Sequence, residues 1–448
     1  MGWFRRRTAR DMAVLDMGQF TPLPRAGFLV GGAVRDTLLG RAVRDLDWLV
    51  PDPEEAAAAA AAALGTRAFA LDATRGHWRV AAGGVTRDYA PLGTDLEANL
   101  RARDFCANAL AADLSGALVD PTGGRGDLRA KRLRMVDAAN LWADPLRGLR
   151  GARLAAELGF DLEAETAAAI GEHSGAVARG EVPPPAAERV GVELSRLLLS
   201  ERAGPGAALL HRLGLLRAYL PELERAAGVA QGGFHHLDVL AHSLEALNQL
   251  TQGFPEADLA LRWATLLHDV GKPDTKRYGP SGRFHFYGHD TLGAEMTKDV
   301  LKRLRLPSAT VERASALVRR HMLPIPKTAR EARRFVHRRR ALLPDLLKLM
   351  IADREAARGP LASEANRRSY RIALSKVLEI LAEPPPKAPL LDGRAVMRLL
   401  ELPPGPRVGE AVRFVREAEA VGDVSTPEEA AAALKRYAAA RGWGAGAG

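Results

Sequence analysis

The chain contains very little cysteine and no long apolar run. Cys106 is the single cysteine among 448 residues, which excludes an intramolecular disulfide and a zinc site built on cysteine thiolates. No apolar run reaches the roughly 18 residues that a membrane-spanning helix needs, and Arg5–Arg7 are not followed by the apolar core of a signal peptide. We therefore expect a cytoplasmic protein without a membrane partner.

The chain also lacks a repeat of fixed period and an excess of acidic residues. The missing repeat excludes a solenoid. The 64 lysines and arginines outnumber the 54 aspartates and glutamates, which gives a formal net charge of +10. This charge favours a polyanionic partner, nucleic acid before a membrane. An arginine-rich composition without functional meaning is the alternative. A chain of this length holds about two to four domains.

A glycine turn after a short apolar strand is the first half of the most informative pattern. Residues 28–30 predict a buried strand that runs directly into Gly31 and Gly32. Because glycine has no Cβ atom, such a turn allows the backbone to approach a ligand closely. Arg35 follows, and its planar guanidinium is suited to phosphate.

Two aspartates on the next predicted strand are the second half of the pattern. Asp45 and Asp47 are separated by one residue at the start of the apolar run 46–50. Alternate residues of a strand point to the same face, so both carboxylates should project together. Paired carboxylates bind Mg²⁺, which a nucleoside triphosphate requires.

Residues 29–40 and 45–47 together resemble the nucleotidyltransferase superfamily of the DNA polymerase β type. The match is best to its class II branch, the tRNA CCA-adding enzymes and bacterial poly(A) polymerases. The resemblance implies an α+β N-terminal nucleotidyltransferase head followed by all-α neck, HD and C-terminal helical domains. It also implies that Asp45 and Asp47 hold two Mg²⁺ ions, which activate an RNA 3′-hydroxyl and neutralise the triphosphate without a covalent nucleophile.

A second block, LRARDFCANALA, resembles the helix that lines the nucleotide site in this family. The resemblance gives nucleotide-binding roles to Arg103, Asp104 and Asn108. Ala102 replaces an arginine of the family pattern, and Arg101 is the candidate to supply the missing charge.

Two further blocks match structural elements of the family. The segment 120–128 carries the family's pair of glycines and predicts a turn between the head and the next domain. Glu188 and Glu193 match a helix of the neck and are expected to brace it rather than to react.

The block around Asp144 and Arg147 resembles the family's Glu-Asp-x-x-Arg motif, with Ala143 in place of the glutamate. A spacing of three places both side chains on one face of a helix. A carboxylate accepts from an exocyclic amine, and a guanidinium donates to the adjacent ring acceptors. Cytosine and adenine fit such a pair, and uracil and guanine do not. An ordinary surface ion pair is the alternative. Arg150 and Arg153 follow on the same helix as further nucleotide-binding candidates.

The C-terminal half carries histidines and aspartates in the order found in the HD phosphohydrolase domain. The resemblance implies a first metal on His242, His268, Asp269 and Asp353, and second-metal ligands at His289 and His321. A divalent transition metal such as Ni²⁺, Mn²⁺ or Co²⁺ suits imidazole ligands. Retention of the fold as an inactive scaffold is the alternative.

The resemblance covers nearly the whole chain and suggests a division into domains. Within the head, residues 53–64 predict an alanine-rich helix, and 80–82 and 85–89 predict strands. The proline triplets 183–185 and 384–386 predict stiff links. The arginine-rich run 330–340 either follows RNA phosphates or forms a solvated helix face.

The domains are a lead-in at 1–25, the catalytic head at 26–135, a helical neck for base recognition and RNA binding at 136–230, the HD domain at 231–360, and a C-terminal tRNA-binding region at 361–448.

The resulting prediction is a tRNA 3′-terminal nucleotidyltransferase that uses CTP and ATP, with an HD phosphohydrolase activity. Few residues separate Tyr89 from Leu100, where complete CCA-adding enzymes commonly carry a longer loop, and this favours CC addition. A poly(A) polymerase shares every motif; the short segment after the last predicted helix disfavours it. An HD hydrolase with an inactive, RNA-binding head is the alternative of another class. The oligomeric state stays open.

Overall fold

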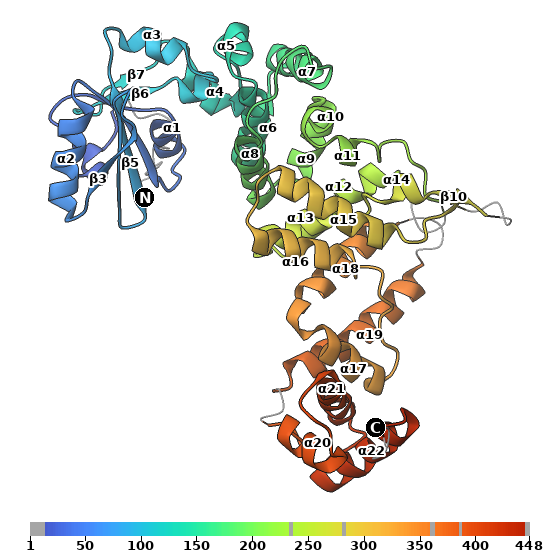
Figure 1. The fold of residues 1–448 in the computed structure, drawn as a ribbon. Helices are drawn as coiled ribbons and strands as arrows, with labels where there is room; N and C mark the ends of the chain where they lie inside the picture. Colours follow the sequence, from blue (N-terminus) through green and yellow to red (C-terminus); the bar gives the residue numbers. More distant parts are fainter. Residues whose placement is uncertain (1–13, 233–235, 280–283, 359–362, 385–387, 444–448) are drawn as a thin grey trace, which may run out of the picture. The chain divides into compact units, whose positions relative to one another are not determined.

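The computed structural model describes residues 14–232, 236–279, 284–358, 363–384 and 388–443 (Figure 1). The chain forms two compact units. The first comprises residues 1–225 with 299–307, and the second comprises 226–298 with 308–448. Among the described residues, no helix combines the length and apolar character that crossing a membrane requires.

The head of the first unit is built on a seven-stranded sheet of order β3-β4-β5-β2-β1-β6-β7. β2 and β5 run parallel, and the other neighbours run antiparallel. Helix α1 packs on β1 and β2, and α2 packs on β4 and β5. The elements are β1 (Phe28–Val30), α1 (Gly32–Leu38), β2 (Asp45–Val50), α2 (Pro53–Leu64), β3 (Ala68–Asp72), β4 (His77–Ala82), β5 (Val85–Pro91), α3 (Leu96–Arg101), β6 (Ala111–Asp113), β7 (Leu118–Val119) and α4 (Gly124–Ala130).

Local sequence explains the elements that carry the first motif. In β2 the side chains alternate, so that Leu46 and Trp48 are buried while Asp45 and Asp47 are exposed. The predicted alanine-rich helix is confirmed as α2. Asp52 caps its start by accepting from the backbone N–H of Glu55, Pro53 occupies its first turn, and Gly65 ends it in the left-handed conformation. The two predicted strands, at 80–82 and 85–89, are confirmed as parts of β4 and β5.

Helices follow the head in the first unit, as the sequence predicts. A short parallel pair, β8 with β9, is an addition to the helical neck. The proline triplet 183–185 lies in the link between α7 and α8. The elements are β8 (Arg132–Leu133), α5 (Ala138–Ala143), α6 (Leu146–Leu158), β9 (Asp161–Leu162), α7 (Ala164–Ala178), α8 (Ala187–Leu199), α9 (Ala203–Arg212), α10 (Leu215–Tyr219) and α11 (Pro221–Glu224).

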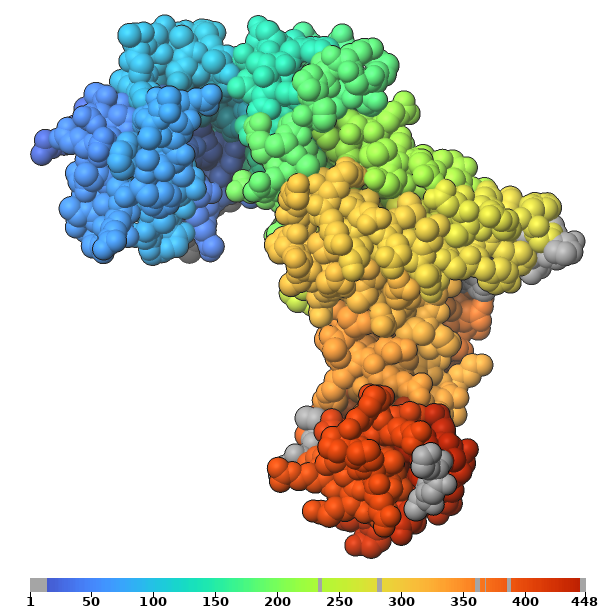
Figure 2. Space-filling view, viewed as in Figure 1, coloured from blue at the N-terminus to red at the C-terminus, as the bar shows by residue number. Residues whose placement is uncertain are grey.

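The second unit begins with a helical array and one small hairpin. α12 packs against α13 and α18, and α13 also packs against α16. The β10–β11 hairpin projects from the neighbouring helices (Figures 1 and 2). The elements are α12 (Val239–Gly253), α13 (Leu259–Leu267), α14 (Lys272–Thr275), β10 (Arg277–Tyr278), β11 (Phe284–His285), α15 (His289–Arg303), α16 (Ser308–Val318) and α18 (Asp345–Ala356).

The C-terminal helices of the second unit surround a small apolar core that includes Val396, Ala411 and Leu434. The arginine-rich run forms α17, and its side chains pair with carboxylates inside the unit. Arg330 binds Asp423, and Arg338 binds Glu417. The run is therefore partly neutralised, which neither alternative from the sequence anticipated. The elements are α17 (Ala329–Arg339), α19 (Glu364–Ala382), α20 (Gly393–Leu400), α21 (Pro406–Ala420) and α22 (Pro427–Ala440). Pro385 and Pro386 lie outside the described residues.

The helix expected across the second block is wrong. α3 ends at Arg101, and only Cys106–Asn108 form a short 3₁₀ turn. Between them Phe105 forms a backbone bridge with Met135, and the Cys106 N–H donates to the carbonyl of Arg134. A helix would leave those backbone groups without these partners.

Candidate active sites

The glycine turn and the aspartates of the head meet at one point. Val30, the last residue of β1, lies opposite Asp47 of β2. Gly31 follows with φ of 74°, a conformation that favours glycine. A Cβ atom at Gly31 would lie 2.5 Å from Nη1 of Arg103 and 3.6 Å from Oδ2 of Asp47. The backbone conformation therefore favours glycine here, and a side chain would also displace the guanidinium of Arg103.

A third carboxylate lies beside the predicted pair. Asp88 of β5 is the parallel register partner of Asp47, and Arg79 holds it through two hydrogen bonds of 2.6 Å. Desolvation inside the cavity raises the pKa of Asp47. Arg103 opposes this shift, whereas Asp88 and Asp45 reinforce it. Carboxylates grouped in this way favour a bound cation.

A cavity of 480 Å³ opens over these aspartates. Its lining combines aspartates with several arginines, which suits a metal-bound polyphosphate. The residues predicted from sequence that line it are Gly32, Arg35, Asp45, Asp47, Arg103, Asp104, Asn108, Arg147, Arg150 and Arg153. The lining residues that sequence reasoning missed include Asp36, Arg44 and Arg196.

A network of ion pairs holds Arg150 and Arg153 of the cavity lining in place. Asp104 accepts from Arg150, and Glu193 of α8 accepts from both Arg150 and Arg153. Glu193 therefore braces the neck, as predicted; Glu188 is exposed. Arg35 donates to Asp36 through Nε and Nη2 and to Asn108 through Nη1. Three of its five N–H donors are thus engaged by side chains, and Arg35 still lines the cavity.

Two details of the arginine predictions are wrong. Arg101 is exposed and pairs with Glu97 four residues earlier, so it does not replace the missing charge at the cavity. Asp144 and Arg147 do not share a helix face, because Asp144 is extended before Pro145 and α6 begins at Leu146. Asp144 accepts from Arg189 at 2.7 Å, and Arg147 donates to the carbonyls of residues 102 and 140.

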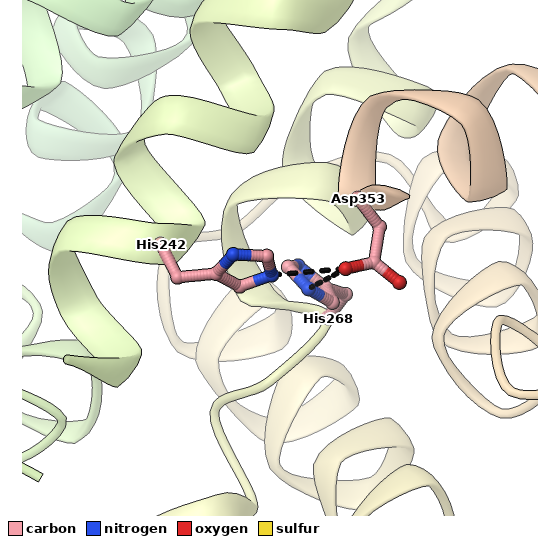
Figure 3. Close-up of side chains that lie close together, drawn as sticks. All are labelled: His242, His268 and Asp353. Carbon is pink, nitrogen blue, oxygen red and sulfur yellow. Dashed lines mark hydrogen bonds and ion pairs between the residues drawn. The ribbon is translucent and has the colours of Figure 1, made fainter. Parts of the chain in front are cut away.

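The predicted histidines and aspartates of the second unit converge into two adjoining triads. His242, His268 and Asp353 form the first (Figure 3). Asp269, His289 and His321 form the second, and the ligand atoms of each triad lie within 4.8 Å of one another. The two Nε2 atoms of His242 and His268 lie 2.9 and 3.6 Å from Oδ1 of Asp353.

Asp269 is a member of the second triad and also contacts the first. Its Oδ2 lies 3.2 Å from Nε2 of His268, and its Oδ1 lies 3.5 Å from Nε2 of His289 and 3.7 Å from Nε2 of His321. Each carboxylate oxygen therefore faces one triad. The sequence predicted Asp269 only for the first metal; the geometry fits a carboxylate that bridges two.

The histidine tautomers suit metal binding. Nδ1 of His268, His289 and His321 each lies 2.6 to 2.8 Å from a backbone carbonyl of its own segment. Such a carbonyl accepts the Nδ1 proton and leaves Nε2 as the inward-facing lone pair. Nε2 of His268 is buried and faces the carboxylates of Asp269 and Asp353. These donors fit a transition-metal pair.

The electrostatics of the cluster favour positive charge inside it. Burial lowers the pKa of His268, but Asp269 and Asp353 outweigh burial and raise it to about 10. Burial acts on Asp269 in the opposite sense, yet His268 and Lys272 hold its pKa well below its usual range. A proton or a metal cation can supply the charge that the carboxylates attract.

Lys272 and Gln231 are residues of this cluster that sequence reasoning missed. Nζ of Lys272 is buried, 2.7 Å from Oδ2 of Asp269 and 2.6 Å from Oε1 of Gln231. The chain Gln231–Lys272–Asp269 orients the bridging carboxylate. Lys272 could have been predicted from the sequence, because it follows Asp269 by three residues. No local pattern pointed to Gln231.

Models of three protein families match the chain: the poly A polymerase head domain at residues 79–134, the "probable RNA and SrmB-binding site of polymerase A" at 159–227, and the HD domain at 233–358. The A-adding tRNA nucleotidyltransferase of Deinococcus radiodurans is 54% identical over 93% of this chain and 96% of its own length. The chain belongs to the tRNA nucleotidyltransferase family.

A second member of this family uses a different nucleotide. The CC-adding tRNA nucleotidyltransferase of Thermus thermophilus is 47% identical over 94% of the chain and 96% of its own length. Among solved structures, the Bacillus stearothermophilus CCA-adding enzyme in complex with CTP has a TM-score of 0.66 at 23% identity, covering 95% of this chain and 96% of that one. This likeness confirms the fold predicted from the sequence. The nucleotidyltransferase and HD domains are both of metal-dependent types.

Proposed function

We propose that this enzyme adds C, A or both to the 3′ end of tRNA, with CTP and ATP as donors. The observation that carries the proposal is the 480 Å³ cavity lined by Asp45, Asp47 and several arginines. Asp45 and Asp47 would hold Mg²⁺, which supplies Lewis-acid activation of the 3′-hydroxyl and charge neutralisation of the triphosphate. The family membership supports the same reaction.

The roles of the arginines follow from their positions. Arg103 lies against both Gly31 and Asp47 and would contact the triphosphate beside the metal carboxylates. Arg150 and Arg153 are fixed by Asp104 and Glu193 and would hold the nucleotide in place with little loss of side-chain entropy. Catalysis would then rest on positioning and charge stabilisation.

Base choice would depend on Arg147 and Asp144. Arg147 lines the cavity, and its guanidinium keeps donors beyond those given to two backbone carbonyls. Arg189 orients Asp144. Burial alone would raise the pKa of Asp144, but its interactions, chiefly the hydrogen bond from Arg189, lower the pKa overall. Asp144 therefore remains a hydrogen-bond acceptor. An acceptor and a donor group matched to cytosine or adenine would reject uracil.

The extent of addition has two candidate answers. Residues 92–95 alone connect β5 to α3, and this short link favours CC addition. The higher identity to the A-adding relative favours A addition. Purified protein should be incubated with tRNA that ends at the discriminator base or at the second C, with each labelled nucleotide. Two C residues on the first substrate support CC addition, and one A on the second supports A addition.

The same experiment separates the remaining alternatives. A poly(A) polymerase would extend either RNA with many A residues and would not require a tRNA body. A protein whose head only binds RNA would incorporate nothing with any nucleotide. Either result would contradict the proposed addition of C or A.

We further propose that the six-residue cluster is a metal-dependent phosphohydrolase. Two inward-facing triads joined by Asp269 support this, because such a centre supplies a hydroxide near neutral pH. Phosphomonoesters and 2′,3′-cyclic phosphates are the proposed substrates. Hydrolysis should be tested with Ni²⁺, Mn²⁺ or Co²⁺. If none supports hydrolysis and metal analysis finds the cluster without metal, the domain is a scaffold.

A further inference from the structure

An exposed aromatic and basic segment lies directly before the metal-ligand candidate His289. It comprises the strands β10 and β11 and the two residues that follow β11, Phe286 and Tyr287 (Figure 1). Tyr278 and Tyr287 are 71% and 83% exposed. Such exposure is costly for two large rings in one short segment and points to a binding surface.

The rings of this segment are arranged as stacking surfaces. His285 and Tyr287 lie parallel, 5.3 Å apart between centroids and 7° between planes. Tyr278 packs edge-on against Phe284 across the hairpin. His285 is half-buried, so the exposed Tyr287 ring is the member of the pair that can offer its outer face to a further planar group.

Positive charge accompanies the rings. Nζ of Lys276 lies 3.9 Å from the centroid of Phe284, and Arg277 is exposed on β10. The sequence 276–288 contains no aspartate or glutamate. Cations interleaved with exposed aromatic rings are the combination that binds single-stranded nucleic acid.

The segment is continuous with the metal cluster. The carbonyl of Phe286 accepts the Nδ1 proton of His289 at 2.6 Å, so the segment itself orients a candidate ligand. Nζ of Lys272, which contacts Asp269, lies 5.4 Å from the ring centroid of Phe286. Tyr287 and His289 are two residues apart, so their Cα atoms lie within about 7 Å.

We propose that Tyr278, Tyr287 and the adjoining cations form a base-stacking platform that delivers the 3′ end of single-stranded RNA to the His/Asp cluster. The proposal rests on the phosphohydrolase function given above and deepens it, because it makes an RNA end the substrate in preference to a small phosphate ester. In the hydrolysis of a 2′,3′-cyclic phosphate, water adds its oxygen to phosphorus, one P–O bond to the ribose breaks, and the released ribose oxygen takes a proton from that water.

Steady-state kinetics of the full-length, metal-loaded protein test the platform. A short RNA with a 2′,3′-cyclic phosphate end is compared with glycerol 2-phosphate, which has no ring to stack. Tyr278→Ala and Tyr287→Ala should each raise the KM for the RNA roughly tenfold, in the range that loss of one stacked base gives, with a smaller change for glycerol 2-phosphate. The Tyr→Phe variants keep the ring and should keep the RNA KM. Ile372→Ala, at an exposed apolar position of α19, is the matched control.

Photo-crosslinking gives a readout that does not depend on turnover. An RNA with 5-iodouridine at its 3′-terminal nucleotide should crosslink to Tyr278 or Tyr287 of the wild-type protein. Crosslinking without any hydrolysis would support the platform and contradict the phosphohydrolase function. Hydrolysis of the RNA with an unchanged KM in both Tyr→Ala variants, and crosslinks only at other residues, would overturn the platform and leave the phosphohydrolase function standing.

Discussion

The head cavity and the His/Asp cluster both gather carboxylates, but they surround them differently. In the head, Asp45 and Asp47 are exposed to a cavity and face arginines that protein carboxylates hold in place. In the cluster, His242, His268 and Asp269 are at most 1% exposed, and imidazoles take the place of arginines. The difference supports the two proposed tasks: an open site would admit a polyphosphate with its own Mg²⁺, and a closed site would retain a resident metal pair.

The largest loss of activity is expected when a metal-binding aspartate of the head is removed. Asp45→Ala or Asp47→Ala should reduce nucleotide addition by at least about a hundredfold, because a metal-binding carboxylate is lost. Binding of tRNA should persist. Labelled CTP and ATP incorporation measures the first, and gel retardation measures the second. Asp72→Ala, an aspartate of β3 in the same sheet, should keep addition. Incorporation at the wild-type level in either site variant contradicts the assignment.

The corresponding change in the cluster should leave the head untouched. Asp269→Asn removes the charge that faces both triads, so hydrolysis and bound transition metal should fall together while nucleotide addition continues. Metal analysis of the purified variant gives the second readout. Glu312→Gln, an exposed carboxylate of α16, is the control. Parallel loss of both activities would show that the two centres are not independent.

A smaller effect on metal binding is expected for Lys272, which contacts Asp269 of the cluster. Lys272→Met removes the cation between Asp269 and Gln231 and should weaken transition-metal affinity roughly 10- to 100-fold, as loss of a supporting contact does. Competition with a fluorescent chelator measures this directly. Lys435→Met changes an exposed lysine of α22 and should have no effect. Unaltered affinity in Lys272→Met would mean that Asp269 is oriented without the lysine.

The smallest expected effect concerns base choice in the head. Arg147→Ala should reduce the preference for CTP over UTP by about tenfold, since a matched side chain and base edge are worth roughly 1–3 kcal/mol. Competition between the two labelled nucleotides measures the preference. Arg212→Ala, an exposed arginine of α9, should leave it unchanged. A preference that survives Arg147→Ala would place base reading on other residues.

Sequence reasoning succeeded where a local pattern sets the geometry. The alternation of β2 placed Asp45 and Asp47 on one face, and the glycine after β1 marked the close approach at Gly31. The resemblance to the HD domain also identified all six residues that form the two triads. In these cases the residue type and its position in a strand or helix were sufficient.

Sequence reasoning failed where the geometry depends on partners distant in the chain. Asp88 reaches Asp47 only through the parallel register of β2 and β5, which no local pattern encodes. The segment around Phe105 is extended and not helical, because Phe105 forms a backbone bridge with Met135. The bridging position of Asp269 depends on the orientation of its two oxygens between α13 and α15. By contrast, the extended conformation of Asp144 was readable from Pro145 and was overlooked.

We propose that two metal centres of different ligand chemistry work independently in one chain. The most direct measurement strips the wild-type protein of metal and follows both reactions in one preparation as Mg²⁺ and then Ni²⁺, Mn²⁺ or Co²⁺ are restored. We predict that Mg²⁺ alone restores nucleotide addition, and that hydrolysis returns only with the transition metal. Recovery of both reactions with the same metal at the same concentration would contradict the claim.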